Sequence, residues 1–472
     1  MKRNNKLFKA IPVATALIFT LMTAWYLFYS PTHNFTETLP GLDERGKGNL
    51  LSEIINIGEF FERFKNSDAS LTDSWPRFRG PDFDNIYKTG NALIDDFSGN
   101  NGEIIWQHEL GEGHAGPAIY KGKVYLLNYD EDERADMLHC FDLRSGDELW
   151  RRWYKVSIKR NHGMSRTVPA VTDDYILTMG PRCHVMCLER ETGNLLWSID
   201  VEKEYESETP LWYTGQCPLI DNGKAIIATG GKAILIAVDC ATGEKIWEVP
   251  NPQNWKMSHS SVLPYVFNGT KMYLYAAVGG AVGISEKGEV LWTLPEWNTN
   301  VIAPSPVAMP DGKIFFSAGY GAGSMMVQLE EQNGKFSTKV LTQYKPRDGL
   351  ATEQQSAIFW QGHLFGIMPK DGGAWRNQLV CVHPSDPTKI IWASDKEHRF
   401  GLGPFIWADG KFYLLNDDGT LHIIKADTRG YQHFDSKIII EDGHDAWAPL
   451  AIADGYMVLR DADRMVCINI GN

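Results

Sequence analysis

Val238-Asp239-Cys240-Ala241-Thr242-Gly243-Glu244-Lys245-Ile246-Trp247 is the stretch that decides the fold of this chain. Within it, Asp239 leads into a turn that closes at Gly243, and Trp247 follows four residues later. An Asp side chain accepts hydrogen bonds from the amides of its own turn, and glycine readily takes the positive φ that such a turn requires. The stretch therefore predicts a tight turn between two β-strands, with a large apolar indole on the second strand.

This turn belongs to a unit that recurs along the chain, with variants at residues 141–150 and 188–197. The unit ends in a tryptophan, or in a less typical residue near Phe336 and Phe434, and the tryptophans are Trp106, Trp150, Trp197, Trp247, Trp292 and Trp392. Each unit opens with a short apolar triplet, and the eight triplets are Pro117-Ala118-Ile119, Pro169-Ala170-Val171, Pro218-Leu219-Ile220, Ser261-Val262-Leu263, Pro306-Val307-Ala308, Ser356-Ala357-Ile358, Pro404-Phe405-Ile406 and Pro449-Leu450-Ala451. A repeat of roughly 45–50 residues with four short strands is typical of a propeller blade. The predicted fold class is therefore all-β, an eight-bladed β-propeller with four-stranded antiparallel blades over residues 75–472.

The strand around Trp106 precedes the first triplet and so has no blade of its own. We expect residues 103–110 to form the outer strand of the last blade, beside residues 465–470. This pairing joins the two ends of the repeat region and leaves no open edge strands, which are prone to aggregation.

The N-terminal residues 1–30 differ from the rest of the chain. Four basic residues precede an uncharged apolar run over residues 10–29, which is long enough for a membrane-spanning helix. A cleaved signal peptide is the alternative, but the run ends in bulky aromatic residues and has no Ala-x-Ala site. The sequence predicts a single-pass transmembrane signal-anchor with its basic end in the cytoplasm, which places the propeller on the periplasmic or other extracytoplasmic side.

Residues 31–74 are polar and glycine-rich, as expected of a linker. Between residues 50 and 64, apolar residues recur at helical spacing, namely Leu51, Ile54, Ile55, Phe61 and Phe64. They predict an amphipathic helix that docks on the propeller or lies on the membrane.

The formal net charge of −13 argues against a nucleic-acid partner, because phosphate binding requires a basic surface. The chain has 7 cysteines, and most of them fall inside apolar strand patterns. We therefore expect most of the cysteines to be buried free thiols.

The recurring unit resembles the tryptophan-docking repeat of the pyrroloquinoline-quinone-like (PQQ-like) β-propeller family, over residues 103–472. Upstream, Trp75-Pro76-Arg77-Phe78-Arg79-Gly80-Pro81 is similar to the opening signature of bacterial members of this family. The resemblance implies one of three functions: a quinone-dependent alcohol dehydrogenase, a polyvinyl-alcohol dehydrogenase, or a non-catalytic outer-membrane assembly scaffold of the BamB type. Because all three functions occur on the same fold, the fold alone does not identify the function of this chain.

For a quinoprotein dehydrogenase, the resemblance implies PQQ beside a Ca²⁺ ion, with a carboxylate base and often a disulfide between adjacent cysteines. No two cysteines are adjacent here, and Cys183 and Cys187 are four residues apart. Glu353 and Asp445 are the only candidate carboxylates, whereas Ca²⁺ takes six to eight oxygen ligands. We therefore expect no catalytic residue, no metal and no cofactor, with PQQ and Ca²⁺ only under the dehydrogenase alternative.

The segments just before the triplets occupy equivalent positions in the blades, so they should converge at one end of the central channel. Their polar and aromatic residues are candidates for a ligand-binding funnel. These candidates are His114, His162, Arg166, Trp212, Gln216, His259, Glu353, His398, Arg399, His444, Asp445 and Trp447. The alternative is that such residues bond neighbouring blades, as in His259-Ser260-Ser261.

The sequence thus favours a non-catalytic binding or scaffolding module that presents one propeller face to a protein, a polymer or a small molecule. The alternative function is a quinone-dependent oxidoreductase that acts on an alcohol, a sugar or polyvinyl alcohol.

Overall fold

The structure is a computed structural model of the 472-residue chain, and it describes residues 5–28, 55–66 and 71–472. The chain divides into two compact units between residues 45 and 46. Of the described residues, the first unit holds the N-terminal helix and the second holds all the β-strands.

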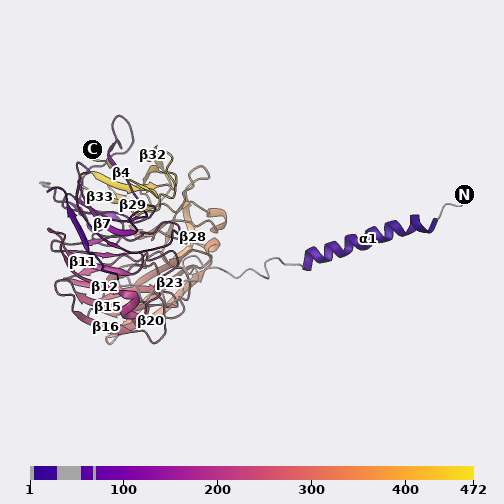
Figure 1. Ribbon diagram of the computed structural model, residues 1–472, viewed down its shortest axis with the longest axis horizontal. Coiled ribbons are helices and arrows are strands. Elements are labelled where there is room, and N and C mark those ends of the chain that lie inside the picture. The colour runs from indigo at the N-terminus through magenta and orange to yellow at the C-terminus, as the bar shows by residue number, and fades with distance from the viewer. Residues whose placement is uncertain (1–4, 29–54, 67–70) are drawn as a thin grey trace. The chain divides into compact units, whose positions relative to one another are not determined.

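The N-terminal helix, α1 (Asn5–Phe28), covers most of the predicted apolar run (Figure 1). Within it, the hydroxyls of Thr15, Thr20 and Thr23 each donate a hydrogen bond to the carbonyl four residues earlier, which satisfies these polar groups inside the helix. A helix in this segment is therefore confirmed. No described helix is long and apolar enough to cross a membrane, and the transmembrane role stays a prediction. The remaining residues of the predicted anchor, 1–4, 29 and 30, lie outside the described residues.

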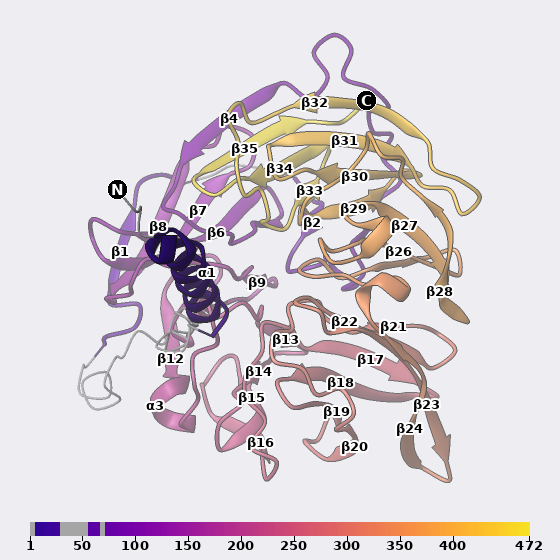
Figure 2. The same cartoon turned by 90° about the vertical axis from the view of Figure 1, so that its right-hand side faces the viewer.

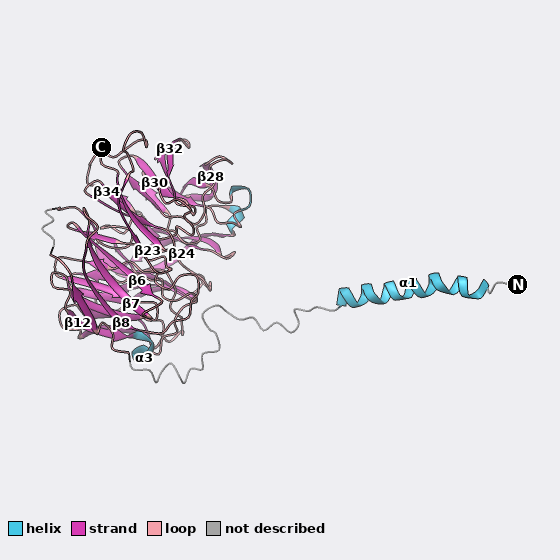
Figure 3. Ribbon diagram, turned by 45° about the horizontal axis from the view of Figure 1, so that its top comes forward, coloured by secondary structure: helices cyan, strands magenta, loops and turns pink. Residues whose placement is uncertain are grey.

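Residues 71–472 form a ring of eight β-sheets that follow one another in chain order, as the colours in Figure 2 show. Strands dominate this unit and helices are few and short (Figure 3). Neighbouring strands within the blades are antiparallel, and each blade has four of them. The eight-bladed propeller predicted from the repeat is confirmed.

Blades 1 and 2 consist of β5 (Ala118–Tyr120), β6 (Lys123–Asp130), β7 (Ala135–Asp142) and β8 (Glu148–Lys155), then β9 (Ala170–Val171), β10 (Tyr175–Met179), β11 (His184–Glu189) and β12 (Leu195–Asp200). Blades 3 and 4 consist of β13 (Leu219–Asp221), β14 (Lys224–Ala228), β15 (Ala233–Asp239) and β16 (Lys245–Pro250), then β17 (Leu263–Phe267), β18 (Thr270–Ala277), β19 (Gly280–Ser285) and β20 (Val290–Leu294). Blades 5 and 6 consist of β21 (Val307–Ala308), β22 (Lys313–Ala318), β23 (Gly323–Gln332) and β24 (Lys335–Tyr344), then β25 (Ile358–Trp360), β26 (His363–Ile367), β27 (Leu379–His383) and β28 (Asp386–Ala393).

Blades 7 and 8 consist of β29 (Phe405–Ala408), β30 (Lys411–Leu415), β31 (Thr420–Lys425) and β32 (His433–Ile438), then β33 (Ala451–Ala453), β34 (Tyr456–Arg460), β35 (Arg464–Asn469) and β4 (Ile104–Glu109). Three further strands precede β4, and these are β1 (Phe60–Arg63), β2 (Ser74–Trp75) and β3 (Ile86–Tyr87). The short helices are α3 (Val201–Tyr205), η2 (Pro346–Asp348) and η3 (Gly373–Trp375).

The ring closes through β4, which pairs antiparallel with β35 so that Trp106 faces Cys467. This confirms the outer strand predicted for residues 103–110. The Trp106 indole also donates a hydrogen bond of 2.8 Å to the Leu143 carbonyl of blade 1. The closing strand is therefore bonded to the last blade and to the first.

Other indoles connect neighbouring blades in the same way. The Trp197 indole donates to the Cys240 carbonyl at 2.9 Å, and Trp247 and Trp392 also donate to carbonyls of the following blade. A Cβ atom on Gly243 would lie 2.7 Å from Cγ of Trp197. Glycine in this turn therefore supplies both a positive φ and the room that the indole of the preceding blade needs.

The amphipathic helix predicted for residues 50–64 is wrong for residues 55–64, the part that the structure describes. These residues form a turn followed by β1, which pairs with β8 as an added outer strand of blade 1. Phe60 stacks on Trp153 with ring centroids 5.5 Å apart. Because an edge strand offers backbone partners as well as an apolar surface, these aromatic residues bury part of their surface in a strand instead of a helix. Residues 50–54 lie outside the described residues.

Residues 74–87 cross one end of the ring and form a plug. Strand β2 pairs with β5 of blade 1, and the Pro76 carbonyl accepts a hydrogen bond from Val171 of blade 2. Further along, the Arg79 guanidinium donates to the Pro306 carbonyl beside blade 5, and β3 runs parallel to β29 of blade 7. The segment that resembles a family signature thus ties together blades on opposite sides of the ring.

A belt of side chains links the inner ends of blades 2 to 6. Val168 N–H donates to Cys217 Sγ, and Cys217 N–H donates to Ser261 Oγ. Ser261 N–H then donates to Ser305 Oγ, and Ser305 N–H donates to Ser356 Oγ. Each bond spans the boundary between two blades, so the residues at the start of these five inner strands are structural, as the alternative interpretation proposed for Ser261.

All 7 cysteines lie in the described part of the chain and are buried and unpaired. The prediction of buried free thiols is confirmed.

Candidate functional site

A cavity of about 110 Å³ opens at the end of the ring where the segments before the triplets converge. Its lining residues are Phe78, His114, Arg166, Trp212, Gly215, Cys217, His259, Val301, Ala303, Tyr320, Glu353, Gln354, Gln355, Trp447 and Pro449. Most of them precede the inner strands, whereas Phe78 comes from the plug, which contacts the other end of these strands. The plug thus contributes to the lining and separates the cavity from the far end of the ring.

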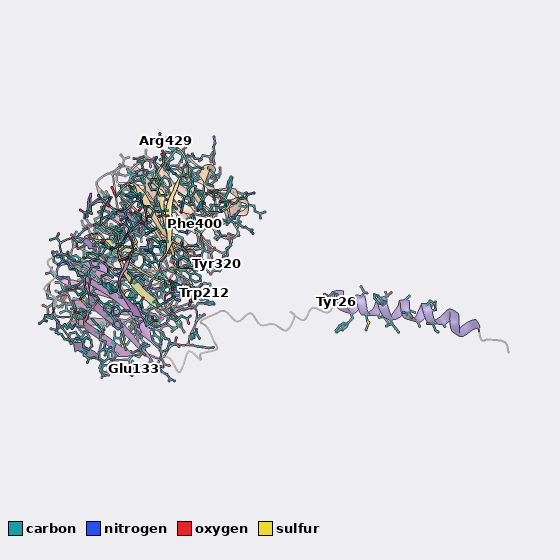
Figure 4. The ribbon with its side chains drawn as sticks, turned by 90° about the horizontal axis from the view of Figure 1, so that it is seen from above. Tyr26, Glu133, Trp212, Tyr320, Phe400 and Arg429 are labelled. Atoms are coloured by element: carbon teal, nitrogen blue, oxygen red, sulfur yellow. The ribbon has the colours of Figure 1, made fainter. Side chains whose placement is uncertain are left out.

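Two aromatic rings from different blades form one wall of the cavity. Trp212 and Tyr320 stack with ring centroids 5.5 Å apart and an angle of 19° between the rings, and Figure 4 shows them side by side. His259 of the blade between them lies with its ring 6.3 Å from that of Trp212. Tyr320 is 63% exposed, so this wall offers a free aromatic surface at the mouth of the cavity.

The opposite wall contains His114 and Trp447, whose ring centroids are 4.9 Å apart. The Trp447 indole donates a hydrogen bond of 2.9 Å to Asp417, and the Trp447 carbonyl accepts one from Gln355. These bonds hold the indole against the histidine.

Arg166 supplies a positive charge to the cavity. Its Nε donates to the Trp212 carbonyl at 2.6 Å, and its Nη2 donates to the His162 carbonyl. Among the described residues no carboxylate forms an ion pair with this guanidinium, and burial lowers its pKa to about 10. Arg166 therefore remains charged at neutral pH, and its two described hydrogen bonds go to neutral carbonyls.

The two histidines of the cavity are neutral at pH 7. Burial, and then the charge of Arg166, lowers the pKa of His259 to about 3. Burial, with Arg166 and Arg460, also holds the pKa of His114 well below its ordinary value. Each imidazole therefore offers one donor and one acceptor.

Glu353 is the only carboxylate among the described residues that line the cavity. Burial raises its pKa, and the negative charge of Asp371 raises it further. A Cβ atom on Gly319 would lie 2.3 Å from Cγ of Glu353, and one on Gly215 would lie 2.7 Å from the His259 ring. Glycines thus leave the space that these two side chains occupy.

Two of the aromatic residues that line the cavity have a strained backbone. Trp212 and Tyr320 have φ values of 59° and 55°. Positive φ is rare for bulky residues and costs of order 1–3 kcal/mol each, and such strain clusters at functional sites.

Six of the twelve predicted site residues line the cavity, and they are His114, Arg166, Trp212, His259, Glu353 and Trp447. Two others lie beside it and contribute backbone. The His162 carbonyl is the acceptor for Arg166, and the Asp445 carbonyl accepts a hydrogen bond from Trp447 N–H.

The other four predicted residues lie outside the cavity. The Gln216 amide bonds both backbone groups of Ala228 and is buried inside blade 3. His444 lies near Asp463, with 3.9 Å between Nε2 and the carboxylate. Both side chains find polar partners in their own or a neighbouring blade, so they turn away from the cavity.

His398 and Arg399 also point elsewhere. His398 Nδ1 bonds Asp395 at 2.9 Å, and the Arg399 guanidinium donates to the Arg376 carbonyl at 2.6 Å. The segment before blade 7 thus contributes no residue to the cavity, as far as the chain is described.

Tyr320, Gln355 and Phe78 are cavity residues that the sequence argument missed. Tyr320 lies in the turn between β22 and β23, not in a segment before a triplet. Its flanking glycines, Gly319 and Gly321, are the signal that could have identified it.

The cavity does not fit the PQQ and Ca²⁺ pair that the resemblance implies. Ca²⁺ takes six to eight oxygen ligands, whereas the acidic and amide side chains of the described lining are Glu353, Gln354 and Gln355 alone. In the described part of the chain, no three His, Cys, Asp or Glu side chains are arranged to hold a metal ion. An engineered cavity of about 150 Å³ accepts benzene, so a cavity of about 110 Å³ suits a group smaller than a tricyclic quinone.

A ring of eight four-stranded blades defines the class, an eight-bladed β-propeller. The model of the family described as outer membrane protein assembly factor BamB matches residues 134–372, about half of the chain. The chain therefore belongs to this BamB-like family of PQQ-like β-propellers. A search of curated protein sequences found no match.

Three solved structures have a similar fold. BamB from Moraxella catarrhalis has a TM-score of 0.52 at 11% identity, over 78% of this chain and 100% of that one. A europium-containing methanol dehydrogenase has a TM-score of 0.61 at 9% identity, over 84% of this chain and 98% of that one. The quinohemoprotein alcohol dehydrogenase ADHIIG from Pseudomonas putida HK5 has a TM-score of 0.56 at 13% identity, over 85% of this chain and 80% of that one. At these identities the likeness establishes the fold only.

Proposed function

We propose that this chain is a non-catalytic binding module whose cavity receives a group of a protein or polymer partner. The observation that carries the proposal is the aromatic mouth formed by Trp212 and Tyr320, which stack on each other although both have positive φ. Positive φ at a bulky residue costs stability, and binding offers a reason to retain it. Aromatic rings that combine a free apolar face with polar groups nearby are common anchors of binding sites.

The chemistry of the cavity favours binding over catalysis. Its histidines are neutral with strongly lowered pKa values, and Glu353 has no second carboxylate beside it in the described lining. Such a site lacks the paired acid and base that proton transfer at neutral pH requires. The family description, an assembly factor, agrees with a scaffolding role. The quinone-dependent alternative draws support from the fold of its neighbours but not from these residues.

Membrane anchorage and an extracytoplasmic location are part of the proposal. Their support is the basic and apolar N-terminal sequence. If the chain is anchored, alkaline carbonate leaves it in the membrane pellet. Release into the supernatant would argue against an anchor.

The binding role is tested by photo-crosslinking in cells of the source organism. A photoreactive phenylalanine analogue replaces Tyr320 at the cavity mouth, and a control carries it at Glu133, far from Trp212 and Tyr320 in Figure 4. We expect an adduct with a partner from position 320, reduced by Trp212→Ala, and a different or no adduct from position 133. Equal adducts from both positions, or none from 320, would overturn the proposal.

A second arm tests the alternative directly. The purified full-length protein is incubated with PQQ and Ca²⁺, and its absorption spectrum and dye reduction with a panel of alcohols are followed. Bound quinone with turnover would overturn the non-catalytic function, and we expect neither.

A further inference from the structure

Three histidines meet on blade 7, and none of them lines the cavity. His433 belongs to β32 and pairs with Ile424, two residues along β31 from His422. The side chains of His422 and His433 therefore lie on the same face of the sheet. A hydrogen bond of 3.2 Å joins their ring nitrogens, His422 Nδ1 and His433 Nε2. His398 stacks on His433 with ring centroids 4.3 Å apart.

Neighbouring residues orient these rings and leave them accessible. Phe400 packs edge-on against His422 with centroids 5.2 Å apart, and Figure 4 marks its place in the propeller. Asp395 bonds Nδ1 of His398 at 2.9 Å, which leaves Nε2 of that ring for another partner. All three imidazoles are partly exposed. A carboxylate that holds the far nitrogen of a histidine is the usual support of a metal-binding imidazole.

The charges around the cluster favour a cation. The negative charge of Asp418 attracts positive charge at His422, and the charges of Asp395 and Asp435 do the same at His433.

We propose that His422 and His433 bind a divalent transition-metal ion of the Zn²⁺ or Cu²⁺ type, with His398 as a third ligand. Two nitrogens bound to one tetrahedral Zn²⁺ at about 2.05 Å are about 3.3 Å apart. The two ring nitrogens, 3.2 Å apart in their hydrogen bond, lie close to that separation, and the ion takes the place of the shared proton. Imidazole nitrogen prefers Zn²⁺, Cu²⁺ and Ni²⁺ over Mg²⁺ and Ca²⁺, which prefer oxygen.

The site is an open one. The three rings do not converge on one point as they stand, and no preformed group of three such ligands occurs in the described residues. The proposal requires the His422 and His433 rings to turn about their Cβ–Cγ bonds until both lone pairs face one ion, and it requires a similar turn of His398. Water fills the remaining positions, so the ion should exchange readily. This inference does not depend on the function of the cavity.

The test is titration of the untagged full-length protein with ZnCl₂ by calorimetry, and with CuCl₂ by electron paramagnetic resonance. We expect one saturable Zn²⁺ site and a Cu²⁺ spectrum with at least two nitrogen ligands. His422→Gln and His433→Gln should each weaken binding by ten-fold or more. Asp395→Asn should weaken it less than either of these variants, because Asp395 acts through His398, the third ligand.

The matched control is His363→Gln on blade 6. His363 and His383 also place their rings in contact, with centroids 5.4 Å apart, but the Nδ1 atoms bond Gln361 and Ser385 instead of each other. We expect this variant to bind like the parent. Absence of saturable binding, or binding that His422→Gln and His433→Gln leave unchanged, would overturn the proposal.

Thermal unfolding gives a second readout if one variant folds poorly. An ion that binds only the folded protein raises its melting temperature. Zn²⁺ should raise the melting temperature of the parent and of His363→Gln but not that of His433→Gln. Equal increases in all three would contradict a site at His422 and His433.

Discussion

The indole of Trp212 and the phenol ring of Tyr320 stack across the cavity mouth, although one belongs to blade 3, the other to blade 5, and both have positive φ. Two separately strained turns thus meet over His259 of the intervening blade, with 5.5 Å between the ring centroids. The stack brings together residues 108 positions apart, and this arrangement is the basis of the binding role proposed above.

When Tyr320 is replaced, the glycine variant should be more stable than the alanine variant, which reverses the usual order of stability. At φ 55°, a Cβ atom costs about 1–2 kcal/mol, so Tyr320→Gly should be more stable than Tyr320→Ala by about 1 kcal/mol. Both variants lose the same stacking contact, which makes them a matched pair. Urea unfolding measures the difference. If alanine is equally or more stable, Tyr320 is not strained.

Gly243 and Gly223 test the space that the indole of the preceding blade needs. Both glycines have positive φ, but a Cβ atom on Gly243 would meet Trp197 at 2.7 Å, whereas one on Gly223 would meet nothing within 4 Å. Gly223→Ala should lower the free energy of unfolding by about 1–2 kcal/mol, because the positive φ is its only penalty. Gly243→Ala should lower it by about 1–3 kcal/mol more, because the added Cβ atom also overpacks against Trp197. Chemical denaturation that shows equal losses would refute this role of Gly243.

The belt at the inner ends of the blades should contribute measurably to stability. Ser305→Ala leaves the buried Ser261 N–H without its acceptor, and we expect a loss of about 1–3 kcal/mol in the free energy of unfolding. Cys217→Ser keeps an acceptor for Val168 N–H and should cost less. Differential scanning calorimetry compares them, and a Ser305→Ala protein that melts with the parent would exclude the belt as a stabilising element.

His259 should make stability depend on pH. Its pKa is about 3 in the folded protein and about 6.5 in an unfolded chain, so the folded state binds fewer protons in this interval. Stability from this group is complete above pH 6.5 and falls as the pH falls toward 3, by up to about 1.4 kcal/mol per pH unit. His259→Gln should remove this slope. At pH 7.5, the difference in the free energy of unfolding between the parent and His259→Gln reports the packing contribution of the side chain. If the dependence of stability on pH is the same in both proteins, His259 is not a neutral buried histidine.

Deletion of residues 103–110 should abolish monomeric folding, because it removes the strand that closes blade 8. Deletion of residues 60–63 is the control, since β1 is an added strand on the outer edge of blade 1. We expect the control to remain a folded monomer with a lower melting temperature. Size-exclusion chromatography and circular dichroism distinguish the two, and a closing-strand deletion that melts like the parent would contradict the assignment.

The sequence predicted the blades well because each blade repeats local signals. Turn residues such as Asp239 and Gly243 act within a few positions of one another, and the triplets mark each inner strand independently. The closing strand was predictable for a related reason, since Trp106 has the residue type of a blade terminus without a blade. Ile55, Phe61 and Phe64 misled because the spacing of a few apolar residues does not distinguish a helix from an added edge strand.

The repeat pattern by itself determined the ring, its eight blades, the place of its closure and the end at which a funnel should form. Only the tertiary structure decided which residues of that end share a cavity. Gln216 and His398 precede triplets as Trp212 and His259 do, yet they turn to Ala228 and Asp395. The direction of a side chain depends on hydrogen-bond partners supplied by distant segments and neighbouring blades, and their positions follow from packing of the whole ring and not from spacing along the chain.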